Sequence, residues 1–484
     1  MDSCGFRIDT TYTQLSKQMF AACQPEKVLS PDLVIINEQL ATDMGLCFSS
    51  LSEHELADFF TGQIQPPGGY TYAQAYAGHQ FGHFTMLGDG RACVWGEHIT
   101  PSGQRFDIQF KGSGPTPYSR GGDGRAALGP VLREYLISEA MHHLGVPSTR
   151  SLAVATTGCQ VFRQSVLPGA VLTRVAGSLI RVGTFQFAAS MQDSSLIDQL
   201  LDYAIMRHDD ACKDADNKAL AFLQSVMHKQ INLIVNWMRV GFIHGVMNTD
   251  NMSISGETLD YGPCAFMDEY DQHTVFSAID HQGRYAYCRQ PIMAQWNLAR
   301  LAQALLPLIH HDRQTAIRLA EDTIDSFSSI YEEQWLAMMR SKLGLLSTRR
   351  QDMQLIQDLL QWMQTHKMDY TNTFLDLGQQ DKPVSAPYAD PAFGHWYQRW
   401  QQRHREHTDD QDNSLAVMRR ANPAVIPRNH QVERALASAQ MGDLSIYREL
   451  LQALAKPYQQ CDQIKPYQTL PQPHERVTQT FCGT

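Results

Sequence analysis

The sequence lacks the features that would place it in a membrane or direct it out of the cell. Residues 1–7 contain neither the basic start nor the apolar stretch of a signal peptide, and no uninterrupted apolar run approaches membrane-spanning length. We therefore expect a cytoplasmic protein without a membrane partner.

Closely spaced cysteines are also missing. The ten cysteines occur singly through 484 residues, without pairs that resemble a zinc site, and this scattered distribution predicts free thiols in a reducing compartment.

Basic residues are in the minority as well, since 40 basic and 50 acidic residues give a formal charge of −10. That balance disfavours a nucleic-acid partner held by phosphate attraction.

The sequence does contain polar residues that suit nucleotide chemistry. Residues 244–251 end in Asp250 and Asn251, and Asp260 follows on a glycine turn. These side chains supply the oxygen groups that Mg²⁺ and a triphosphate require: one Asp able to accept a hydroxyl proton, an Asn beside it and a second Asp. They follow one another in the order of a kinase catalytic loop and metal-binding loop. The same residue types are common in turns and helix caps, so their surroundings decide between the two interpretations.

Those surroundings favour a functional site. Apolar residues recur at three- and four-residue spacing between residues 221 and 240, which predicts an amphipathic helix leading into the loop. Residues 252–254 and 265–267 are expected to form two short strands of a hairpin around Asp260, with Gly256 in the turn. Two carboxylates and an amide would then converge.

A second polar pair lies upstream. Residues 106–111 alternate apolar and polar side chains with the period of a half-buried strand, which turns Lys111 away from the Phe face. The helix that follows has Pro130 in its first turn and carries Glu134. We expect Glu134 to pair with Lys111 and to orient its ammonium toward phosphates, although either residue taken singly could be an ordinary surface charge.

Glycine-rich segments adjoin this strand. Residues 112–125 contain too many glycines for regular structure, and residues 87–91 form a second glycine turn. Glycines let backbone N–H groups approach phosphate oxygens, but either segment could also be a hairpin turn. Further on, Arg174 and Arg181 lie in apolar surroundings, where arginines require anions. An acidic chain with arginines gathered in its first half suits a small polyanion better than a long one.

These motifs, in this order, resemble the selenoprotein O family, also called the YdiU family, of kinase-like protein adenylyltransferases. The resemblance spans nearly the whole chain. The segments that carry it are residues 76–82, 87–91, 111–127, 172–187, 241–261, 280–285 and 422–430.

The resemblance implies an α+β fold, namely a protein-kinase-like, two-lobed pseudokinase with a helical C-terminal extension. It also implies that ATP lies reversed relative to ordinary protein kinases, so that the α-phosphate meets the acceptor. Asp250 would be the proton acceptor, and Asn251 and Asp260 the metal ligands. Lys111 and Glu134 would hold the phosphates. The remaining residues implied for the nucleotide pocket are Gly88, Gly90, Arg91, Asp123, Gly124, Arg174 and Arg181.

The expected reaction is transfer of AMP from ATP to Ser, Thr or Tyr hydroxyls of target proteins, with release of pyrophosphate and with Mg²⁺ or Mn²⁺ as cofactor. The chemistry of the residues leaves two alternatives open, an ordinary ATP-dependent phosphotransferase and a non-catalytic ATP-binding scaffold. Relatives suggest a further variant, UMP transfer with Mn²⁺.

Along the chain we expect an N-terminal lobe over residues 1–182, a mostly helical catalytic lobe over residues 183–340, and a helical extension with a cysteine-containing tail over residues 341–484. Redox-linked family members carry a cysteine or selenocysteine near the C-terminus, and Cys482 keeps that place here. The loop 274–279, where some bacterial members have a cysteine, contains none. A regulatory disulfide through Cys482 is therefore a hypothesis without an identified partner.

Overall fold

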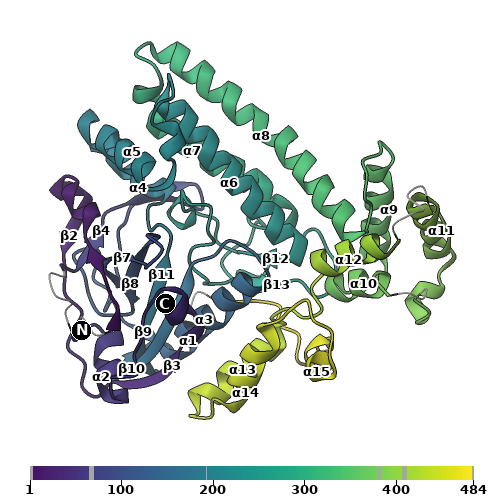
Figure 1. Cartoon of the computed structure of the whole chain (residues 1–484), viewed down its shortest axis with the longest axis horizontal. Coiled ribbons are helices and arrows are strands. Elements are labelled where there is room, and N and C mark those ends of the chain that lie inside the picture. The colour runs from purple at the N-terminus through teal and green to yellow at the C-terminus, as the bar shows by residue number, and fades with distance from the viewer. Residues whose placement is uncertain (1–3, 65–69, 192, 380–382, 406–410, 482–484) are drawn as a thin grey trace.

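A computed structural model describes residues 4–64, 70–191, 193–379, 383–405 and 411–481 (Figure 1). A large antiparallel sheet dominates the N-terminal part, and long helices lie beside one another in the middle of the chain. The C-terminal segments, drawn in yellow, run back from the distal helices toward the sheet, and the last described residues lie beside Lys111 of that sheet.

The main sheet has nine strands in the order β2-β4-β7-β8-β11-β10-β3, with β1 beside β7 and β9 beside β11. All of its pairings are antiparallel. Its strands are β1 (Ile8–Asp9), β2 (Phe20–Ala22), β3 (Asp32–Ile36), β4 (Tyr72–Gln74), β7 (Ala92–Ile99), β8 (Arg105–Lys111), β9 (Ala126–Ala127), β10 (Arg150–Phe162) and β11 (Val166–Ala176). A separate two-stranded sheet joins β5 (Ala77–Gln80) to β6 (His83–Met86).

Strand β8 confirms the predicted alternation. Ile108 and Phe110 pack with Trp95 in an apolar cluster that includes residues of α1 (Glu38–Asp43) and α2 (Glu53–Phe60). The alternate side chains of β8, which include Lys111, face the other side of the sheet. Helix α3 (Leu128–His143) covers that side against β10 and β11 and is buried along most of its length. Lys111 and Glu134 are thus brought to the same side of the sheet.

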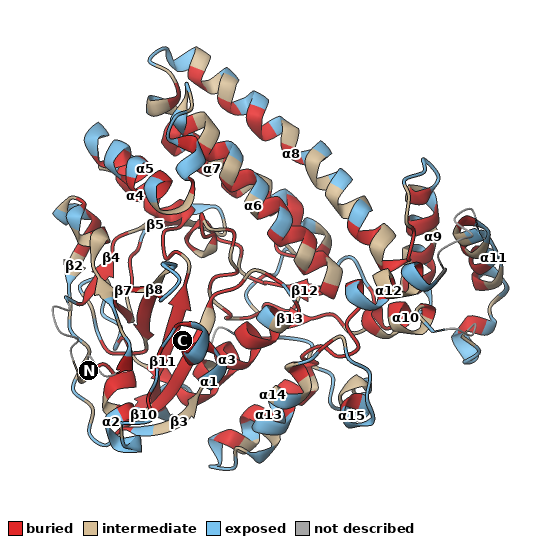
Figure 2. Ribbon diagram, viewed as in Figure 1, coloured by how far each residue is buried: buried red, intermediate tan, exposed pale blue. Residues whose placement is uncertain are grey.

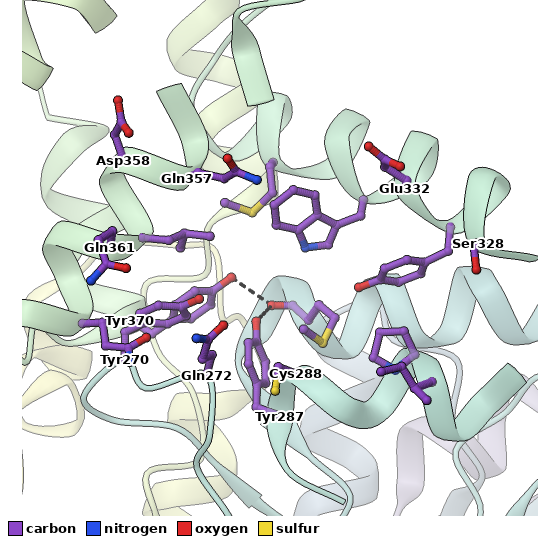
Figure 3. A pocket seen from close by; sticks show the side chains of 18 of the residues that line it. Tyr270, Gln272, Tyr287, Cys288, Ser328, Glu332, Gln357, Asp358, Gln361 and Tyr370 are labelled. Carbon is purple, nitrogen blue, oxygen red and sulfur yellow. Dashed lines mark hydrogen bonds between the residues drawn. The ribbon is translucent and has the colours of Figure 1, made fainter. Parts of the chain in front are cut away.

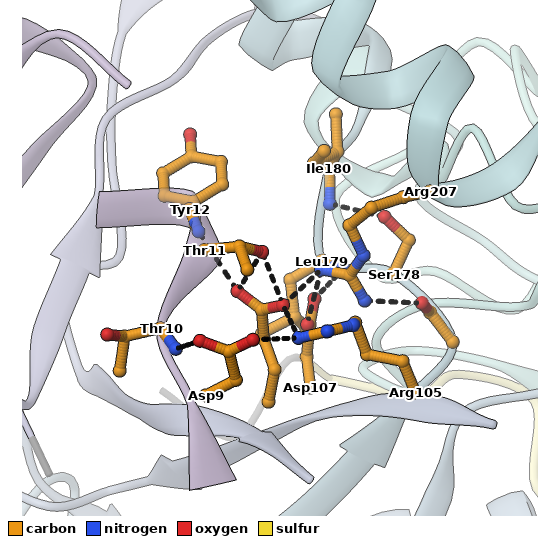
Figure 4. Close-up of polar contacts among 12 residues, drawn as sticks. Asp9, Thr10, Thr11, Tyr12, Arg105, Asp107, Ser178, Leu179, Ile180 and Arg207 are labelled. Carbon is orange, nitrogen blue, oxygen red and sulfur yellow. Dashed lines mark hydrogen bonds and ion pairs between the residues drawn. The ribbon is translucent and has the colours of Figure 1, made fainter. Parts of the chain in front are cut away.

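A buried ion network anchors the polar face of β8 (Figure 4). Asp107 accepts from Arg207 Nη1 at 2.8 Å and from the backbone N–H of Leu179 at 2.8 Å. Arg207 belongs to α5 (Ser194–His208), so the network ties the sheet to the helices that follow it. It also fixes the chain immediately before Arg181, which explains how that arginine is held.

The middle of the chain consists mainly of long helices, whose buried faces turn toward one another (Figure 2). These are α4 (Val182–Ser190), α5, α6 (Lys218–Val240), α7 (Gln290–Ile309) and α8 (Arg313–Lys342). Helix α6 confirms the amphipathic helix predicted before the catalytic loop. It ends at Gly241, whose left-handed φ of 71° turns the chain into β12 (Phe242–Ile243).

The short strands near the metal-binding loop pair differently from the prediction. β13 (Ala265–Phe266) pairs with β12, so a hairpin between residues 252–254 and 265–267 is wrong. The turn at Gly241 brings the Phe242 ring to 5.3 Å from the Phe266 ring, and this aromatic contact accompanies the observed pairing. Gly256 does lie in a turn, with a φ of 76°.

The C-terminal extension is helical, as predicted. It contains α9 (Asp352–Thr365), α10 (Tyr370–Leu377), α11 (Pro391–Arg405), α12 (Gln411–Ala421), α13 (Asn429–Gln440), α14 (Ser445–Leu454) and α15 (Lys465–Gln468). Helices α13 and α14 pack on α3, and Tyr447 donates its hydroxyl to the carbonyl of Leu132 at 2.8 Å. The extension therefore packs against the helix that carries Glu134 and supports it.

The combination of helices with a large antiparallel sheet agrees with the α+β class. The kinase-like, two-lobed arrangement and the division at residues 182 and 340 stay predictions. Within the described ranges, no helix is long and apolar enough to span a membrane.

Candidate active site

Four charged side chains from separate parts of the chain meet at the end of β8. Lys111 Nζ lies 2.5 Å from Glu134 Oε2 and also donates to Asp260 Oδ1. Arg174 on β11 donates its Nε to Glu134 Oε1 at 3.0 Å, and its Nη2 lies 3.2 Å from Asp260 Oδ1. The expected contact between Lys111 and Glu134 is present, and Arg174 and Asp260 join it.

Strand pairing explains part of this convergence. Arg174 stands opposite Gln109 in the β11–β8 register, which puts it on the same face as Lys111. Its Nη1 donates to Gln109 Oε1 at 3.1 Å. Asp260 follows in an irregular segment with a left-handed φ of 69°, a conformation that Asp tolerates better than most residues.

The neighbouring charges shift the pKa values of Asp260 and Arg174. Burial alone would raise the pKa of Asp260, but Lys111 and Arg174 outweigh it and hold that pKa well below its usual range. Burial alone would likewise lower the pKa of Arg174, yet the carboxylates of Glu134 and Asp260 raise it. The lowered pKa favours the ionised carboxylate, which is the form that would bind a metal ion.

We expect Glu134→Gln to reduce stability as well as activity. The substitution removes the carboxylate shared by Lys111 and the buried Arg174, and removing one partner of a buried pair costs about 3–5 kcal/mol. Because Asp260 remains as a partner for both cations, we expect the lower end of that range, measured by chemical denaturation. Glu433→Gln is the control, since Glu433 is 50% exposed in its pair with Arg133. Equal loss of stability in the two variants would contradict this account.

A cavity of about 420 Å³ opens beside the cluster. Arg91, Lys111, Glu134 and Asp260 line it, together with residues of the C-terminal tail. The tail is held in place by Thr480, which donates its Oγ1 to the carbonyl of Pro263 at 2.6 Å and its N–H to the carbonyl of Phe276 at 2.7 Å. The last described residues therefore border the cavity, which sequence reasoning missed.

Arg181 forms a second buried pair. Its Nη2 lies 3.7 Å from Asp89 Oδ1, and its guanidinium lies 4.2 Å from the centre of the Tyr76 ring. Burial raises the pKa of Asp89, although Arg181 opposes the rise. The anions predicted for Arg174 and Arg181 are thus carboxylates of the chain itself.

Gly88 and Gly90 flank Asp89 and pack against the glycine-rich loop. A Cβ at Gly88 would lie 2.4 Å from the Tyr118 ring, and one at Gly90 would lie 2.9 Å from the Tyr118 carbonyl oxygen. The glycines therefore allow the two loops to approach each other. Whether they also contact a nucleotide stays a prediction.

Asp123 and Gly124 do not line the cavity beside Lys111. Asp123 is 41% exposed and binds Arg163 through both carboxylate oxygens, at 2.8 and 3.0 Å. The carbonyl of Gly124 accepts from the N–H of Gly114 at 3.1 Å. The structure engages Asp123 in a surface ion pair, and a nucleotide role for both residues stays a prediction.

The loop 244–251, which is predicted to be catalytic, is held by the β5–β6 hairpin. The N–H of His79 donates to Thr249 Oγ1 at 2.7 Å, and the N–H of Phe81 donates to Asn248 Oδ1 at 3.0 Å. These contacts join residues far apart in the sequence and fix the turn that carries Asp250.

Asp250 lies in that turn, and one of its carboxylate oxygens accepts no hydrogen bond from the described residues. It is 8% exposed, and its Oδ2 is 3.4 Å from Gln80 Nε2. Its Oδ1 is buried and has no hydrogen-bond partner within the described part of the chain. Buried carboxylate oxygens are nearly always paired, so this atom is suited to receive a proton from a substrate.

Gly78 on β5 leaves room for that oxygen. A Cβ at Gly78 would lie 2.5 Å from Asp250 Oδ1. We expect Gly78→Ala to slow transfer about 100-fold, because a misplacement on the order of 1 Å has that effect, and to leave ATP affinity unchanged. Steady-state kinetics and ATP titration measure the two quantities. Gly394→Ala is the control because a Cβ there meets no atom within 4 Å; equal rates in the two variants would refute the steric argument.

The activity should depend on the ionisation of Asp250. Burial raises its pKa, while Arg181 and Gln80 oppose the rise. A general base works only when deprotonated, so kcat/KM should fall as the pH drops through this raised pKa. Gln80→Leu removes a donor to the charged form and should move the fall to higher pH, whereas Gln39→Leu, exposed on α1, should not. A profile of Gln80→Leu that is unmoved or moved to lower pH would contradict the assignment.

Asn251 and Asp260 offer oxygen atoms to a divalent cation. Asn251 Nδ2 donates to the carbonyl of Val246 at 3.0 Å, which leaves its Oδ1 as the ligand atom. The described residues contain no group of three His, Cys, Asp or Glu side chains that would form a protein-only metal site. Mg²⁺ commonly uses one or two protein ligands together with substrate phosphates, so this donor set fits Mg²⁺ or Mn²⁺ bound with a triphosphate.

Comparison with known proteins identifies the family of the chain. Residues 5–455 match the family described as Protein adenylyltransferase SelO. The chain belongs to the SelO family. The protein nucleotidyltransferase YdiU of Nitrosococcus oceani is 56% identical over 481 residues, which cover 99% of this chain and 98% of the relative. The proteins of the same name from Alcanivorax borkumensis and Bacillus thuringiensis are 54% and 52% identical over 99% and 100% of this chain, and over 99% of each relative. Membership confirms the predicted family and the enzyme class, nucleotidyl transfer.

The segment 422–430, whose chemistry carried no signal in the sequence, supports the residues that follow the predicted metal ligand Asp260 in this SelO-family chain. Asn429 accepts from the N–H of Phe266 at 3.1 Å and donates to its carbonyl at 2.8 Å. Arg428 is 1% exposed and pairs with Asp268 at 2.7 Å and with Asp369 at 2.9 Å. The segment therefore anchors β13, which follows Asp260 in the chain.

Apart from Cys4, the cysteines in the described part of this SelO-family member are free thiols. Cys264 is fully buried, and Cys288 lies with its Sγ 3.8 Å from His273 Nδ1. Cys482 lies outside the described residues. A regulatory disulfide through Cys482 therefore stays a hypothesis.

A larger cavity, of about 770 Å³, lies between α7, α8 and α9 (Figure 3). Its walls are rich in aromatic and amide side chains, and the hydroxyls of Tyr287 and Tyr370 both donate to the carbonyl of Met238. None of its lining residues is Lys or Arg, so it offers no cation to a triphosphate. We therefore place the candidate nucleotide site of this SelO-family chain at the smaller cavity beside Lys111.

Proposed function

We propose that the protein transfers AMP from ATP to Ser, Thr or Tyr hydroxyls of other proteins and releases pyrophosphate. The observation that carries the proposal is the meeting of Lys111, Glu134 and Asp260 beside a cavity, in a chain of the SelO family. The names of the relatives, protein nucleotidyltransferase, support a protein acceptor and a nucleotide donor.

In the proposed site, Lys111 and Arg91 present positive charge to the phosphates, and Glu134 orients Lys111. A divalent cation held by Asn251 and Asp260 would neutralise further phosphate charge. Arg174 is already paired with Glu134 and Asp260, so its part is to hold Asp260 in place.

Asp250 accepts the proton of the acceptor hydroxyl as the hydroxyl oxygen attacks the α-phosphorus. The bond from the α-phosphorus to the bridging oxygen breaks, and pyrophosphate leaves with that oxygen. Negative charge grows on the leaving group, which the cations around the cavity stabilise. The reversed direction of ATP rests on the family resemblance.

The chemical identity of the added group tests the proposal. The protein is incubated with ATP, UTP or an equal mixture of the two and with either Mg²⁺ or Mn²⁺, and modified peptides are identified by mass spectrometry. We expect AMP on Ser, Thr or Tyr. Phosphate on those residues would make the protein a phosphotransferase, preferential addition of UMP from UTP with Mn²⁺ would make it a uridylyltransferase, and bound but unconverted ATP would favour a scaffold.

A further inference from the structure

We propose that Arg284, Trp296 and Arg300 form a docking site for an acidic segment of the protein acceptor. This inference rests on the proposed function, because it assumes that the acceptor is a protein. It concerns a binding step that can be measured in the absence of nucleotide.

Arg284 and Arg300 both stack against the indole ring of Trp296. Trp296 and Arg300 belong to α7, and Arg284 precedes that helix. The guanidinium carbon of Arg284 lies 4.9 Å from the centre of the Trp296 ring, and that of Arg300 lies 5.1 Å from it. Stacking on an aromatic ring fixes each guanidinium while leaving its N–H groups free to bind an anion.

Neither arginine is neutralised within the described part of the chain. No carboxylate there lies within 4.0 Å of either guanidinium, and the buried Nε of each has no hydrogen-bond acceptor. By contrast, Arg174 and Arg207 pair closely with carboxylates. Two neighbouring guanidinium groups without an ion-pair partner among the described residues, in a chain of net charge −10, form a site that an external carboxylate would complete.

This arginine pair is linked to the loop that carries Asp250. The Trp296 ring lies 5.3 Å from the His79 ring, and the N–H of His79 binds Thr249. On the other side, Tyr285 next to Arg284 donates its hydroxyl to Asn248 Oδ1 at 2.6 Å. A segment bound to the arginines would therefore lie near the proposed proton acceptor.

The surroundings suit a polypeptide. A cavity of about 620 Å³ beside Arg300 is lined partly by Phe84, and both Phe84 and Met86 on β6 are 47% exposed. Asp193 also lines the cavity, but its Oδ1 accepts from the N–H of Ser195 and caps α5. Arginine beside exposed aromatic and methionine side chains is typical of protein interfaces, whereas the net charge of the chain disfavours nucleic acid.

Peptide binding tests the inference directly. The full chain is titrated, without ATP, with two fluorescent peptides in which a central tyrosine is flanked either by glutamates or by glutamines. We expect the wild type to bind the glutamate peptide about tenfold more tightly, because each arginine would pair with a carboxylate of that peptide and with none of the glutamine peptide. Arg284→Gln/Arg300→Gln should lose this preference.

Arg313→Gln/Arg318→Gln is the matched control, because it removes the same charge from exposed positions of α8. It should keep the preference, and so should Arg284→Lys/Arg300→Lys in large part; thermal unfolding checks that each variant is folded. Equal binding of the two peptides by the wild type, the same loss in the control, or tighter binding of a single-stranded oligonucleotide of equal length would overturn the inference.

The peptide titration and the AMP-transfer assay distinguish failure of the proposed function from failure of the docking site. If the protein does not transfer AMP, the preference for the glutamate peptide still appears in the absence of ATP. If the docking site is wrong, AMP transfer persists and the preference is missing.

Discussion

Asp260→Ala is expected to abolish nucleotidyl transfer and to leave the protein folded. The substitution removes a proposed metal ligand whose charge is already fixed by Lys111 and Arg174. Loss of one such preorganised contact typically costs roughly 3–4 kcal/mol of barrier, or about 10²–10³ in rate. Glu134 still neutralises both cations in the variant, and Asp260 is the more exposed of the two carboxylates, at 23% against 4% for Glu134. We therefore expect a much smaller loss of stability than in Glu134→Gln. AMP incorporation and thermal unfolding measure the two effects.

Asp271→Ala is a suitable control, because Asp271 is exposed and follows in the same region of the chain. Its rate and melting temperature should match those of the wild type. Turnover close to wild type in Asp260→Ala would remove Asp260 from the mechanism. A loss of stability as large as that of Glu134→Gln would make its role structural.

Asp250→Asn is expected to lower kcat by about 10²–10⁴, the range that general bases contribute, and to change ATP affinity only slightly. The amide keeps the shape of the side chain and its place beside Gln80, but it cannot take a proton. Rapid measurement of AMP transfer at saturating ATP gives kcat, and equilibrium titration gives the affinity. Asp202→Asn, exposed on α5, should leave both quantities unchanged.

Gly78→Ala should slow transfer by displacing the same carboxylate, that of Asp250. In the Asp250→Asn background, the added methyl group should therefore cost little further rate, although it costs about 100-fold in the wild type. Additive losses in the double variant would show that Gly78 acts elsewhere. An Asp250→Asn enzyme with normal kcat would exclude Asp250 as the proton acceptor.

Local patterns made the Lys111–Glu134 contact predictable. The alternation along β8 fixed the direction of Lys111, and the helix that follows supplied one carboxylate at the right place. The amphipathic helix α6 was likewise predictable, since its apolar positions keep one spacing over many residues. The helical extension followed from the same kind of pattern.

Contacts between distant segments could not be derived in this way. Asp260 meets Lys111, and Gln80 meets Asp250, only because the whole sheet and the helices place them together. The incorrect hairpin has the same origin: two-residue strands carry no periodic signal, so their partners depend on tertiary packing such as that of Phe242 on Phe266. The family resemblance pointed to the segment 422–430, whose residues gave no chemical reason for its anchoring role.

The transfer of AMP, with ATP reversed, is tested most directly by ATP labelled separately at the α- or the γ-phosphate. The protein is incubated with each label and Mg²⁺ or Mn²⁺, with Asp260→Ala as the inactive control, and label retained by protein is measured. The account predicts stable incorporation of the α-label without the γ-label, and neither in the variant. Incorporation of the γ-label would contradict it and establish phosphoryl transfer instead.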